Sequence, residues 1–285
     1  MHLLAFDTST DALSVAVLRS APSGSEVWQH QGAGGASASG SLIATAMDLL
    51  RQADLRLQDL GAICFGCGPG SFTGLRTACS VAQGLAYGAG LKVLPVSSLL
   101  ALAQSARATC APHAQQGHVH ALLDARMDEV YAASYVFDGD VWSAVQAPCL
   151  LAPEQVAAWS HASYVQSASP PTGVSPWRAW AGNVFGIYGP RLAAPSDLLC
   201  CDSLPQAVAI LQLAPALIAA GACVSPDQAL PLYVRDKVAK TTGERAAEKA
   251  AKAGHALTPH AAGLVLSSER PIEDPPATHA PTVGT

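Results

Sequence analysis

Charge is scarce in this chain of 285 residues: only 13% are Asp, Glu, Lys or Arg, whereas 50% are hydrophobic and 6% aromatic. The 16 basic residues are outnumbered by 21 acidic ones, and the net charge of −5 argues against an autonomous nucleic-acid binder that works by counterion release. Residues 236–285 hold six charges of each sign, so the whole net charge belongs to residues 1–235. So few charges in residues 1–235 indicate either a large surface that is buried or covered by a partner, or a membrane protein.

Long hydrophobic runs are lacking as well. The most apolar stretch, residues 207–224, contains Gln212, Pro215 and Gly221, whereas a membrane span needs about 20 apolar residues. We interpret it as a buried helix that is broken at Pro215. Near the N-terminus, Asp7 comes too early for the apolar core of a signal peptide. We therefore expect a cytoplasmic protein with reduced thiols and no membrane association.

Patterns of metal ligands are also missing. Cys64 and Cys67 form a C-x-x-C without a second such pair, whereas a zinc site needs four ligands at paired spacing. No H-x-x-x-H occurs among the nine histidines, so we expect no metal site. Buried, unreactive thiols are the commoner state of cytosolic cysteines, and a redox role for Cys64 and Cys67 is the alternative.

Short apolar runs alternate with stretches of helical periodicity, which is typical of an α/β fold. The expected strands are residues 2–7, 13–18, 59–65, 91–96, 119–124 and 130–137. The expected helices are residues 41–54, 72–88, 97–106, 153–159 and 204–220. Residues 20–41 and 107–118 are predicted as loops, the second as a domain boundary, and residues 166–181 as an insertion. The Pro-, Ser- and Thr-rich composition near the C-terminus predicts a flexible tail over 240–285.

The two halves of the chain share a weak repeat. An apolar strand ends at Asp7 in the first half and at Asp124 in the second, and a turn and another strand follow each. When these aspartates are aligned, Asp11 falls on Asp128. The repeat has two interpretations, an internal duplication or a chance match. With the loop over 107–118 as the boundary, we expect an N-terminal lobe over 1–106 and a C-terminal lobe over 118–235.

A glycine-rich loop over residues 66–74 lies between a predicted strand and a predicted helix, where backbone amides and a helix N-terminus can hold an anion. It is not a P-loop, because no Gly-Lys-Ser/Thr follows. It is not a dinucleotide fingerprint either, because the third glycine after Gly68 and Gly70 would fall at Thr73. A tight turn with close packing is the favoured interpretation, and a phosphate cradle is the alternative.

Asp7 also has two interpretations. Followed by Thr8 and Ser9, it matches the carboxylate with which actin-like phosphotransferases hold a metal-bound phosphate; alternatively, it caps its own turn. A working ATPase would need further phosphate and nucleotide loops in the second half, where the chain offers only Gly182 and Asn183. Asp7, Thr8 and Ser9 are therefore expected to be vestigial phosphate-site positions.

Motifs spread over residues 1 to about 236 resemble the TsaB (YeaZ) family of bacterial tRNA threonylcarbamoyladenosine biosynthesis proteins. They are FDTST at 6–10, GPGSFTGLR at 68–76, PVSSL at 95–99, LDAR at 123–126, DEVY at 128–131 and PLYVR at 231–235. The GPGSFTGLR string is highly specific. Its family positions are Gly68, Pro69, Gly70, Ser71, Phe72, Thr73, Gly74 and Arg76.

The resemblance implies a duplicated actin-like (ASKHA, ribonuclease H-like) fold of two lobes, with mixed sheets flanked by helices and the last part of the chain returning to the first lobe. It implies a non-catalytic subunit, with no cofactor of its own, that binds and activates the paralogue TsaD. TsaD transfers the threonylcarbamoyl group to the adenosine beside the anticodon of tRNAs that read codons beginning with A. The ATPase TsaE is a further partner, whereas a homodimer and a nucleotide at the junction with TsaD are left open.

In this family the first two helices form a four-helix interface with TsaD or with a second copy. The corresponding helices here are 41–54 and 72–88, whose small and apolar side chains suit packing on a partner or on the chain's own sheet. The predicted interface residues are Leu42, Ala46, Leu49, Leu75, Cys79 and Ala82. The family's His-Ser pair before the first helix has no counterpart in ASASGS at 36–41.

Two other functions compete with this one. A self-sufficient actin-like ATPase or kinase would use Asp7 and the loop over 66–74. A peptidase would need a Ser, His and Asp arrangement, and no recognisable spacing supports one. If the family resemblance holds, the acidity of the body leaves tRNA contact mainly to the partner.

Overall fold

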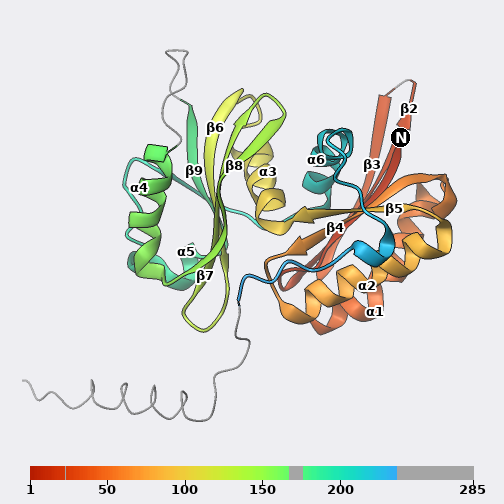
Figure 1. The fold of residues 1–285 in the computed structure, drawn as a ribbon, viewed down its shortest axis with the longest axis horizontal. Helices are drawn as coiled ribbons and strands as arrows, with labels where there is room; N and C mark the ends of the chain where they lie inside the picture. The colour runs from red at the N-terminus through yellow and green to blue at the C-terminus, as the bar shows by residue number, and fades with distance from the viewer. Residues whose placement is uncertain (23, 167–175, 236–285) are drawn as a thin grey trace, which may run out of the picture. The chain divides into compact units, whose positions relative to one another are not determined.

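The computed structural model describes residues 1–22, 24–166 and 176–235 (Figure 1). The chain divides into two units, Met1–Asp236 and Lys237–Thr285, and the described residues all belong to the first. The predicted tail over 240–285 therefore lies outside the described residues. The first unit is built on two five-stranded sheets.

The first sheet has the strand order β3-β2-β1-β4-β5. Its strands are β1 His2–Asp7, β2 Ala12–Ala21, β3 Gly24–Ala33, β4 Leu60–Gly68 and β5 Lys92–Ser97. β1, β2 and β3 pair antiparallel, whereas β1, β4 and β5 run parallel. Phe6 lies between Val15 and Phe65 in this register, so large apolar side chains cross the middle of the sheet.

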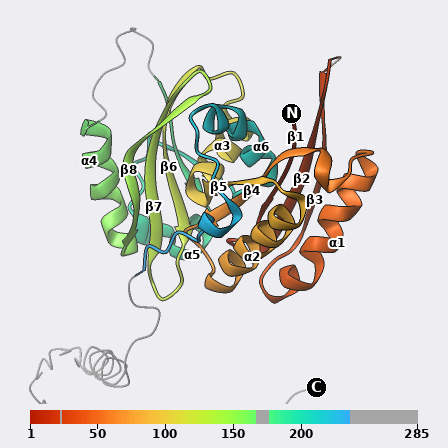
Figure 2. The same ribbon diagram turned by 45° about the vertical axis from the view of Figure 1, so that its right-hand side comes forward.

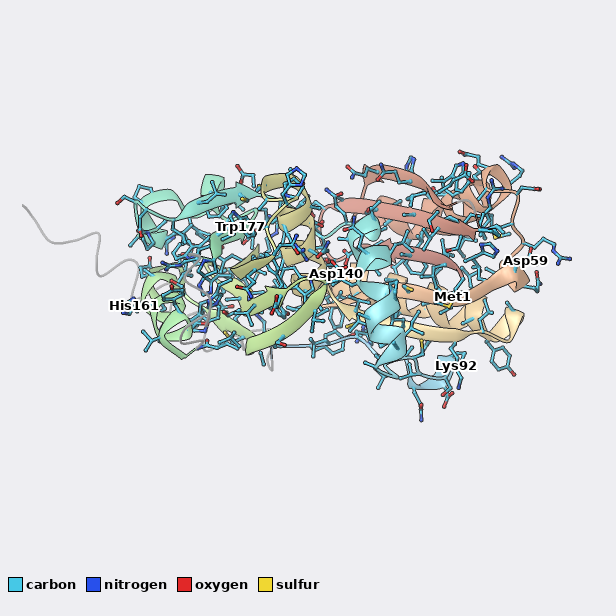
Figure 3. The ribbon with its side chains drawn as sticks, turned by 90° about the horizontal axis from the view of Figure 1, so that it is seen from above. Met1, Asp59, Lys92, Asp140, His161 and Trp177 are labelled. Atoms are coloured by element: carbon cyan, nitrogen blue, oxygen red, sulfur yellow. The ribbon has the colours of Figure 1, made fainter. Side chains whose placement is uncertain are left out.

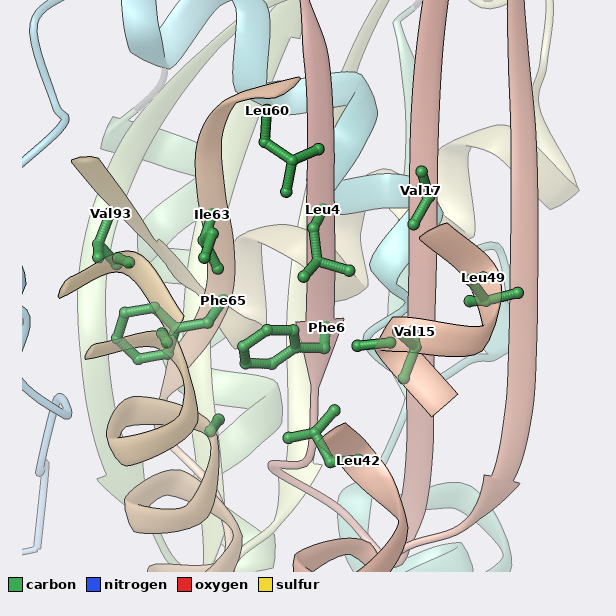
Figure 4. Close-up of a cluster of buried hydrophobic side chains, with 14 of the residues drawn as sticks. Leu4, Phe6, Val15, Val17, Leu42, Leu49, Leu60, Ile63, Phe65 and Val93 are labelled. Atoms are coloured by element: carbon green, nitrogen blue, oxygen red, sulfur yellow. The ribbon is translucent and has the colours of Figure 1, made fainter. Parts of the chain in front are cut away.

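Helices cover both faces of the first sheet because successive side chains of a strand point to opposite faces. The long helices are α1 Ala36–Gln52, α2 Phe72–Ala89, α3 Ser98–Cys110 and α6 Ala207–Ala219. Leu4 and Phe6 of β1 pack in a buried cluster with α1 and α2 (Figure 4). Leu3 and Ala5 pack on the opposite face with α6 and part of α3.

The second sheet has the order β10-β9-β6-β7-β8. Its strands are β6 Gln116–Asp124, β7 Val130–Asp138, β8 Val141–Leu151, β9 Trp177–Gly182 and β10 Leu199–Asp202. The α3 helix packs on one face, and α4 (Val156–Gln166) packs on the other, beside the short helix α5 (Phe185–Tyr188). Single 3-10 turns are η1 Leu57–Asp59, η2 Pro153–Gln155, η3 Gly189–Leu192 and η4 Pro226–Gln228.

The two sheets follow one plan. In each, the first three strands in the chain pair antiparallel. The fourth strand pairs in parallel with the first, and the fifth pairs in parallel with the fourth. Asp7 and Asp124 end the equivalent strands β1 and β6. The predicted duplicated α/β fold of the actin-like (ASKHA, ribonuclease H-like) class is confirmed.

The sheets occupy different parts of the unit. Figure 3 shows Met1, Asp59 and Lys92 in the part with the first sheet, and His161 and Trp177 in the part with the second. The α3 helix contributes to the buried clusters of both sheets, and α6 follows the second sheet in the chain but packs on the first. The predicted lobe limits, 1–106 and 118–235, stay a prediction.

Several expected elements were wrong. The predicted loop over 20–41 contains β3, which lies at the edge of the sheet and is mostly exposed, so it lacks the apolar alternation of a buried strand. The α1 helix also begins within that stretch, at Ala36. The predicted loop over 107–118 is shorter than expected, because α3 runs to Cys110 and β6 begins at Gln116.

Two further expectations were wrong in the second half. The predicted insertion over 166–181 contains most of β9, which pairs with β6 and β10 inside the second sheet. The α6 helix runs through Pro215 without ending there, because Ile210, Leu213 and Ala214 hold it in the core of the first sheet. None of the helices in the described residues is long and apolar enough to span a membrane.

Candidate functional site

Asp7 is a buried carboxylate, 1% exposed, at the end of β1. Oδ1 accepts hydrogen bonds from the backbone N–H and the hydroxyl of Ser9 at 2.7 and 2.6 Å, and Oδ2 accepts one from the Ser98 hydroxyl at 2.8 Å. Burial raises the pKa of Asp7, and these hydrogen bonds oppose the rise. Both carboxylate oxygens are thus engaged within the protein, as expected for an aspartate that caps its own turn.

The glycine loop packs directly on the turn that follows β1. The Thr8 hydroxyl donates to the backbone carbonyl of Gly74 at 2.7 Å. A Cβ atom on Gly74 would lie 1.8 Å from the carbonyl oxygen of Thr8, and one on Gly66 would lie 1.7 Å from Oδ2 of Asp7. Gly74 is therefore required by a close backbone contact and Gly66 by the buried Asp7 side chain, which favours the tight-turn interpretation over the phosphate cradle.

The other family positions of the loop lie between β4 and α2. Gly68 ends β4, and its N–H donates to the Ser98 hydroxyl at 3.2 Å. The Gly68–Pro69 peptide bond is cis. A Cβ on Gly70 would lie 2.4 Å from the carbonyl oxygen of Ser9. Ser71 precedes the first residue of α2, and Ser71, Phe72 and Thr73 are exposed.

Arg76 is held on the outside of α2 by two aromatic rings. Its guanidinium carbon lies 3.8 Å from the centre of the Phe72 ring, and its Nε donates to the Tyr233 hydroxyl at 3.1 Å. The two rings are 5.6 Å apart. Within the described residues, no carboxylate forms an ion pair with Arg76. Its orientation is therefore fixed while its charge remains at the surface.

Residues 229–235, which we call the C-terminal strap, connect α2 and the glycine loop to the second sheet. The backbone N–H of Leu232 donates to the carbonyl of Cys67 at 2.7 Å. At the other end, the Arg235 guanidinium pairs with the Glu129 carboxylate and donates to the carbonyl of Ala125 at 3.1 Å. The strap therefore joins segments that lie far apart in the sequence.

The turn between β6 and β7, residues 125–129, brings Arg126 between the two equivalent aspartate turns. Its guanidinium pairs with Asp11 after β1 and with Asp124 Oδ2 at 3.3 Å. The carboxylate of Asp124 also accepts a hydrogen bond from the Tyr188 hydroxyl at 2.7 Å. Residues 126–128 have φ angles between 58° and 61°, which L residues rarely adopt. An ion pair therefore joins the turn after β1 to the turn after β6.

A cleft of about 560 Å³ lies beside this ion pair. Asp11 lines it from the turn after β1, and Asp202 lines it from the end of β10. Asn183 and Gln206 add amide groups, and no lysine or arginine is among the described residues that line the cleft. The lining is therefore polar and acidic, with the carboxylate of Asp11 already paired to Arg126.

The predicted partner interface stays a prediction, and its six side chains do not lie at the surface of this chain. All six are buried inside the chain, at most 5% exposed, because the apolar stripes of α1 and α2 face the chain's own sheet. They are Leu42, Ala46, Leu49, Leu75, Cys79 and Ala82. The two helices lie side by side in Figures 1 and 2. Their exposed apolar side chains are Ile43, Met47, Phe72 and Tyr87, which we call the α1/α2 outer surface.

The redox alternative for Cys64 and Cys67 was also wrong. Three residues apart on β4, they point to opposite faces of the sheet and belong to different buried clusters. Burial raises the pKa of both thiols, that of Cys67 to about 12. In the described ranges, no group of three His, Cys, Asp or Glu side chains is placed to hold a metal ion.

Three residues of this region had no role assigned from the sequence. They are Ser98, which hydrogen-bonds to Asp7, Arg126, which pairs with Asp11, and Arg235, which pairs with Glu129. Each lies within a motif that the sequence analysis noted, PVSSL, LDAR or PLYVR. The motifs were the available signal, whereas the partners became visible only in the fold.

Comparisons with known proteins place these features in a family. The family model described as "TsaD: tRNA N6-adenosine threonylcarbamoyltransferase" matches residues 37–209. The tRNA threonylcarbamoyladenosine biosynthesis protein TsaB of Escherichia coli strain K12 is 34% identical over 244 residues, 84% of this chain and 96% of that protein. TsaB of Haemophilus influenzae is 31% identical over 84% of this chain and 95% of that protein.

Two solved structures from Pseudomonas aeruginosa are also similar. One is described as an uncharacterized protein with similarity to peptidase YEAZ; it is 36% identical, with a TM-score of 0.68, over 82% of this chain and 99% of that chain. The other is described as YeaZ; it is 35% identical, with a TM-score of 0.65, over 81% of this chain and 99% of that chain.

Proposed function

Since the chain belongs to the TsaB (YeaZ) family of tRNA threonylcarbamoyladenosine biosynthesis proteins, we propose that it is a non-catalytic subunit that binds and activates TsaD. TsaD then transfers the threonylcarbamoyl group to the adenosine beside the anticodon of tRNAs that read codons beginning with A. The ATPase TsaE joins this complex, and the setting is the cytoplasm. The earlier interpretation as a phosphotransferase is the second candidate.

The observation that carries this proposal is that the carboxylate of Asp7, the residue expected at a phosphate site, is already engaged within the chain. Both oxygens of Asp7 accept hydrogen bonds from side chains or backbone of the same chain, and Gly74 packs on Thr8 without room for a Cβ atom. The Arg126 guanidinium pairs with Asp11 and Asp124, so these two carboxylates are also engaged within the chain. A member of an actin-like fold with this arrangement is suited to a structural role.

The α1/α2 outer surface supports the proposal that a partner binds this chain. Ile43 and Met47 are one helical turn apart and 49% and 44% exposed, while Tyr87 on the adjacent helix is 84% exposed. Apolar side chains gathered on two neighbouring helices are typical of a docking surface. We propose that TsaD covers this surface and that a second copy of the chain covers it when TsaD is absent.

The net charge of this chain supports a complex in which TsaD makes most of the contacts with tRNA. With a net charge of −5 and two aspartates in the cleft, the chain offers little attraction for phosphates. We propose that tRNA contacts the complex mainly through TsaD. A nucleotide, if present, would bind at the junction with TsaD and not in the cleft of this chain.

Charged substitutions on the α1/α2 outer surface are expected to weaken the complex. The double variant Ile43→Glu, Met47→Glu places two carboxylates in an apolar contact, so we expect binding to TsaD to weaken at least about 100-fold. Binding is measured by titration calorimetry, and threonylcarbamoyladenosine by mass spectrometry of tRNA digests. Val141→Glu is the matched control, because Val141 is 66% exposed on the second sheet.

Reconstitution without this chain tests the activating role itself. We expect TsaD-dependent modification to fall at least about 10-fold when the chain is omitted or replaced by the double variant, and to be normal with Val141→Glu. Equal modification with and without the chain would show that it is not an activating subunit. Binding that survives the double variant would place the interface elsewhere.

The competing phosphotransferase function predicts that the isolated chain hydrolyses ATP, whereas the proposed non-catalytic function predicts that it does not. We expect the purified chain to release no phosphate above background, and Asp7→Asn to leave this background unchanged. The measurement is phosphate release with excess Mg²⁺ and ATP. A turnover that Asp7→Asn abolishes, in a variant whose circular dichroism spectrum is native, would favour the ATPase or kinase.

A further inference from the structure

Three cysteines gather where α3 meets the edge strand β10. Cys110 is the last residue of α3 and is exposed. Cys201 on β10 is 3% exposed and packs in the same buried cluster as Ala103 and Ala106 of α3. Because Cys110 follows Ala106 by four residues, it continues the helix face that covers β10. Cys200, the third cysteine, is exposed.

Cys110 and Cys201 are neighbours where α3 contacts β10, although the two residues are far apart in the sequence. Cys200 precedes Cys201 on the same strand, so its side chain points to the opposite face of the sheet. All three cysteines are free thiols in the structure. The fold therefore selects one partner for Cys110.

We propose that Cys110 and Cys201 form a reversible disulfide when the protein meets a peroxide, a modification site that is independent of the proposed function. The Cys110 sulfur attacks one oxygen of hydrogen peroxide; an S–O bond forms, the O–O bond breaks, and water leaves with the thiol proton. The Cys201 sulfur then attacks the Cys110 sulfur; the S–S bond forms, the S–O bond breaks, and a second water leaves. The thiols lose two electrons, and the peroxide gains them.

The environments of the two thiols set the order of these steps. Cys110 is exposed at the end of a helix, so peroxide reaches it first. Burial raises the pKa of Cys201 to about 12, and the contact with Cys110 adds to this rise, so Cys201 is a protonated and protected thiol. Because Cys201 must lose its proton to attack, the second step is the slower one.

The disulfide would fix α3 to the edge of the second sheet. Since α3 packs on both sheets, the bond fastens a helix that is shared by the two lobes. It also closes a loop of about 90 residues, which restricts the unfolded chain and predicts a rise in melting temperature of about 5 °C.

The test treats the full chain with hydrogen peroxide, blocks the remaining thiols with an alkylating agent, and measures the intact mass and the tryptic peptides. We expect two thiols fewer for alkylation, a mass about 2 Da lower before alkylation, and one cross-link between Cys110 and Cys201. A dithiol reductant restores the original mass and melting temperature. Cys110→Ser and Cys201→Ser abolish the cross-linked species, whereas Cys200→Ser, the matched neighbour, retains it.

Other outcomes overturn the proposal. Oxidation of Cys110 that stops at added oxygen atoms, with Cys201 still open to alkylation after unfolding, would show that the pair does not react. A cross-link that persists in Cys201→Ser would assign the bond to Cys200. A cross-link between two molecules would assign it to association of the chain. Because alkylation and mass report these results, they do not depend on TsaD.

Discussion

The variant Gly74→Ala is expected to lose about 3 kcal/mol or more of the free energy of unfolding, although alanine is the better helix former. Its Cβ atom would lie 1.8 Å from the carbonyl oxygen of Thr8, which belongs to the backbone and cannot rotate away. The strand end and α2 must then separate, and the hydrogen bond from the Thr8 hydroxyl to the Gly74 carbonyl is lost. Urea unfolding of the isolated chain, followed by circular dichroism, measures the change.

Gly84→Ala is the matched control in the same helix. Nothing lies within 4 Å of a Cβ atom at Gly84, so the usual preference of helices for alanine should raise the free energy of unfolding by about 0.5–1 kcal/mol. The two substitutions are chemically identical and opposite in expected sign. If Gly74→Ala proved as stable as the parent, the loop and the turn after β1 would not pack as closely as described.

Acid is expected to destabilise the protein through two buried histidines. His118 and His120 of β6 are 3% and 4% exposed, with ring centres 4.5 Å apart. Burial lowers the pKa of His118 to about 4 and that of His120 to about 3; Arg178 lowers both further, and the nearby His118 ring also lowers that of His120. The ordinary value of 6.5 applies to the unfolded chain. Their neutral forms are therefore part of the native state.

The sign of the pH effect follows from these values. Below pH 6.5 the unfolded chain binds protons that the folded chain excludes, so the stability present above that pH is lost as the pH falls toward 4. We expect a loss of about 2 kcal/mol per histidine at pH 5, measured by urea unfolding at several pH values.

The variant His120→Phe isolates this contribution. It keeps a ring beside Trp159 and removes both a titrating group and the Nδ1 atom, which is buried with no hydrogen-bond partner in the described structure. Between pH 7 and pH 5, the variant should lose about 2 kcal/mol less than the parent. Asp7, whose pKa is raised, changes stability in the opposite direction but is present in both proteins and cancels. If the free energy of unfolding changed with pH by the same amount in the parent and in the variant, the assignment to His120 would be contradicted.

Periodicity was sufficient to predict the elements that bury a regular apolar face. The short apolar run over residues 3–6 predicted β1, and the helical stripe after the glycine loop predicted α2 with nearly correct ends. Polar edge strands carry no such signal, which is why β3 was predicted as a loop. In β9 the pattern was obscured by the Pro- and Ser-rich residues that precede it in the sequence.

The candidate site was less predictable, because its contacts join residues that are distant in the sequence. The Ser98 hydroxyl that donates to Asp7 lies 91 residues away, and the Arg126 guanidinium that pairs with Asp11 lies 115 residues away. Helical periodicity also could not distinguish a stripe that faces the chain's own sheet from one that faces a partner. The buried Leu42 and the exposed Ile43 are neighbours on α1, and only the sheet beneath them decides which one is outside.

The position of α6 has a consequence for synthesis on the ribosome. One face of the first sheet is covered by a helix that is encoded after the whole second sheet. At roughly 5–20 residues per second, about 5–20 s pass between the emergence of β5 and that of α6. During that interval Leu3, Ala5 and their neighbours are not yet covered by α6, so the nascent first lobe exposes apolar side chains that can associate with other chains. Completion of the first sheet's cover thus waits for residues 207–219 to be translated.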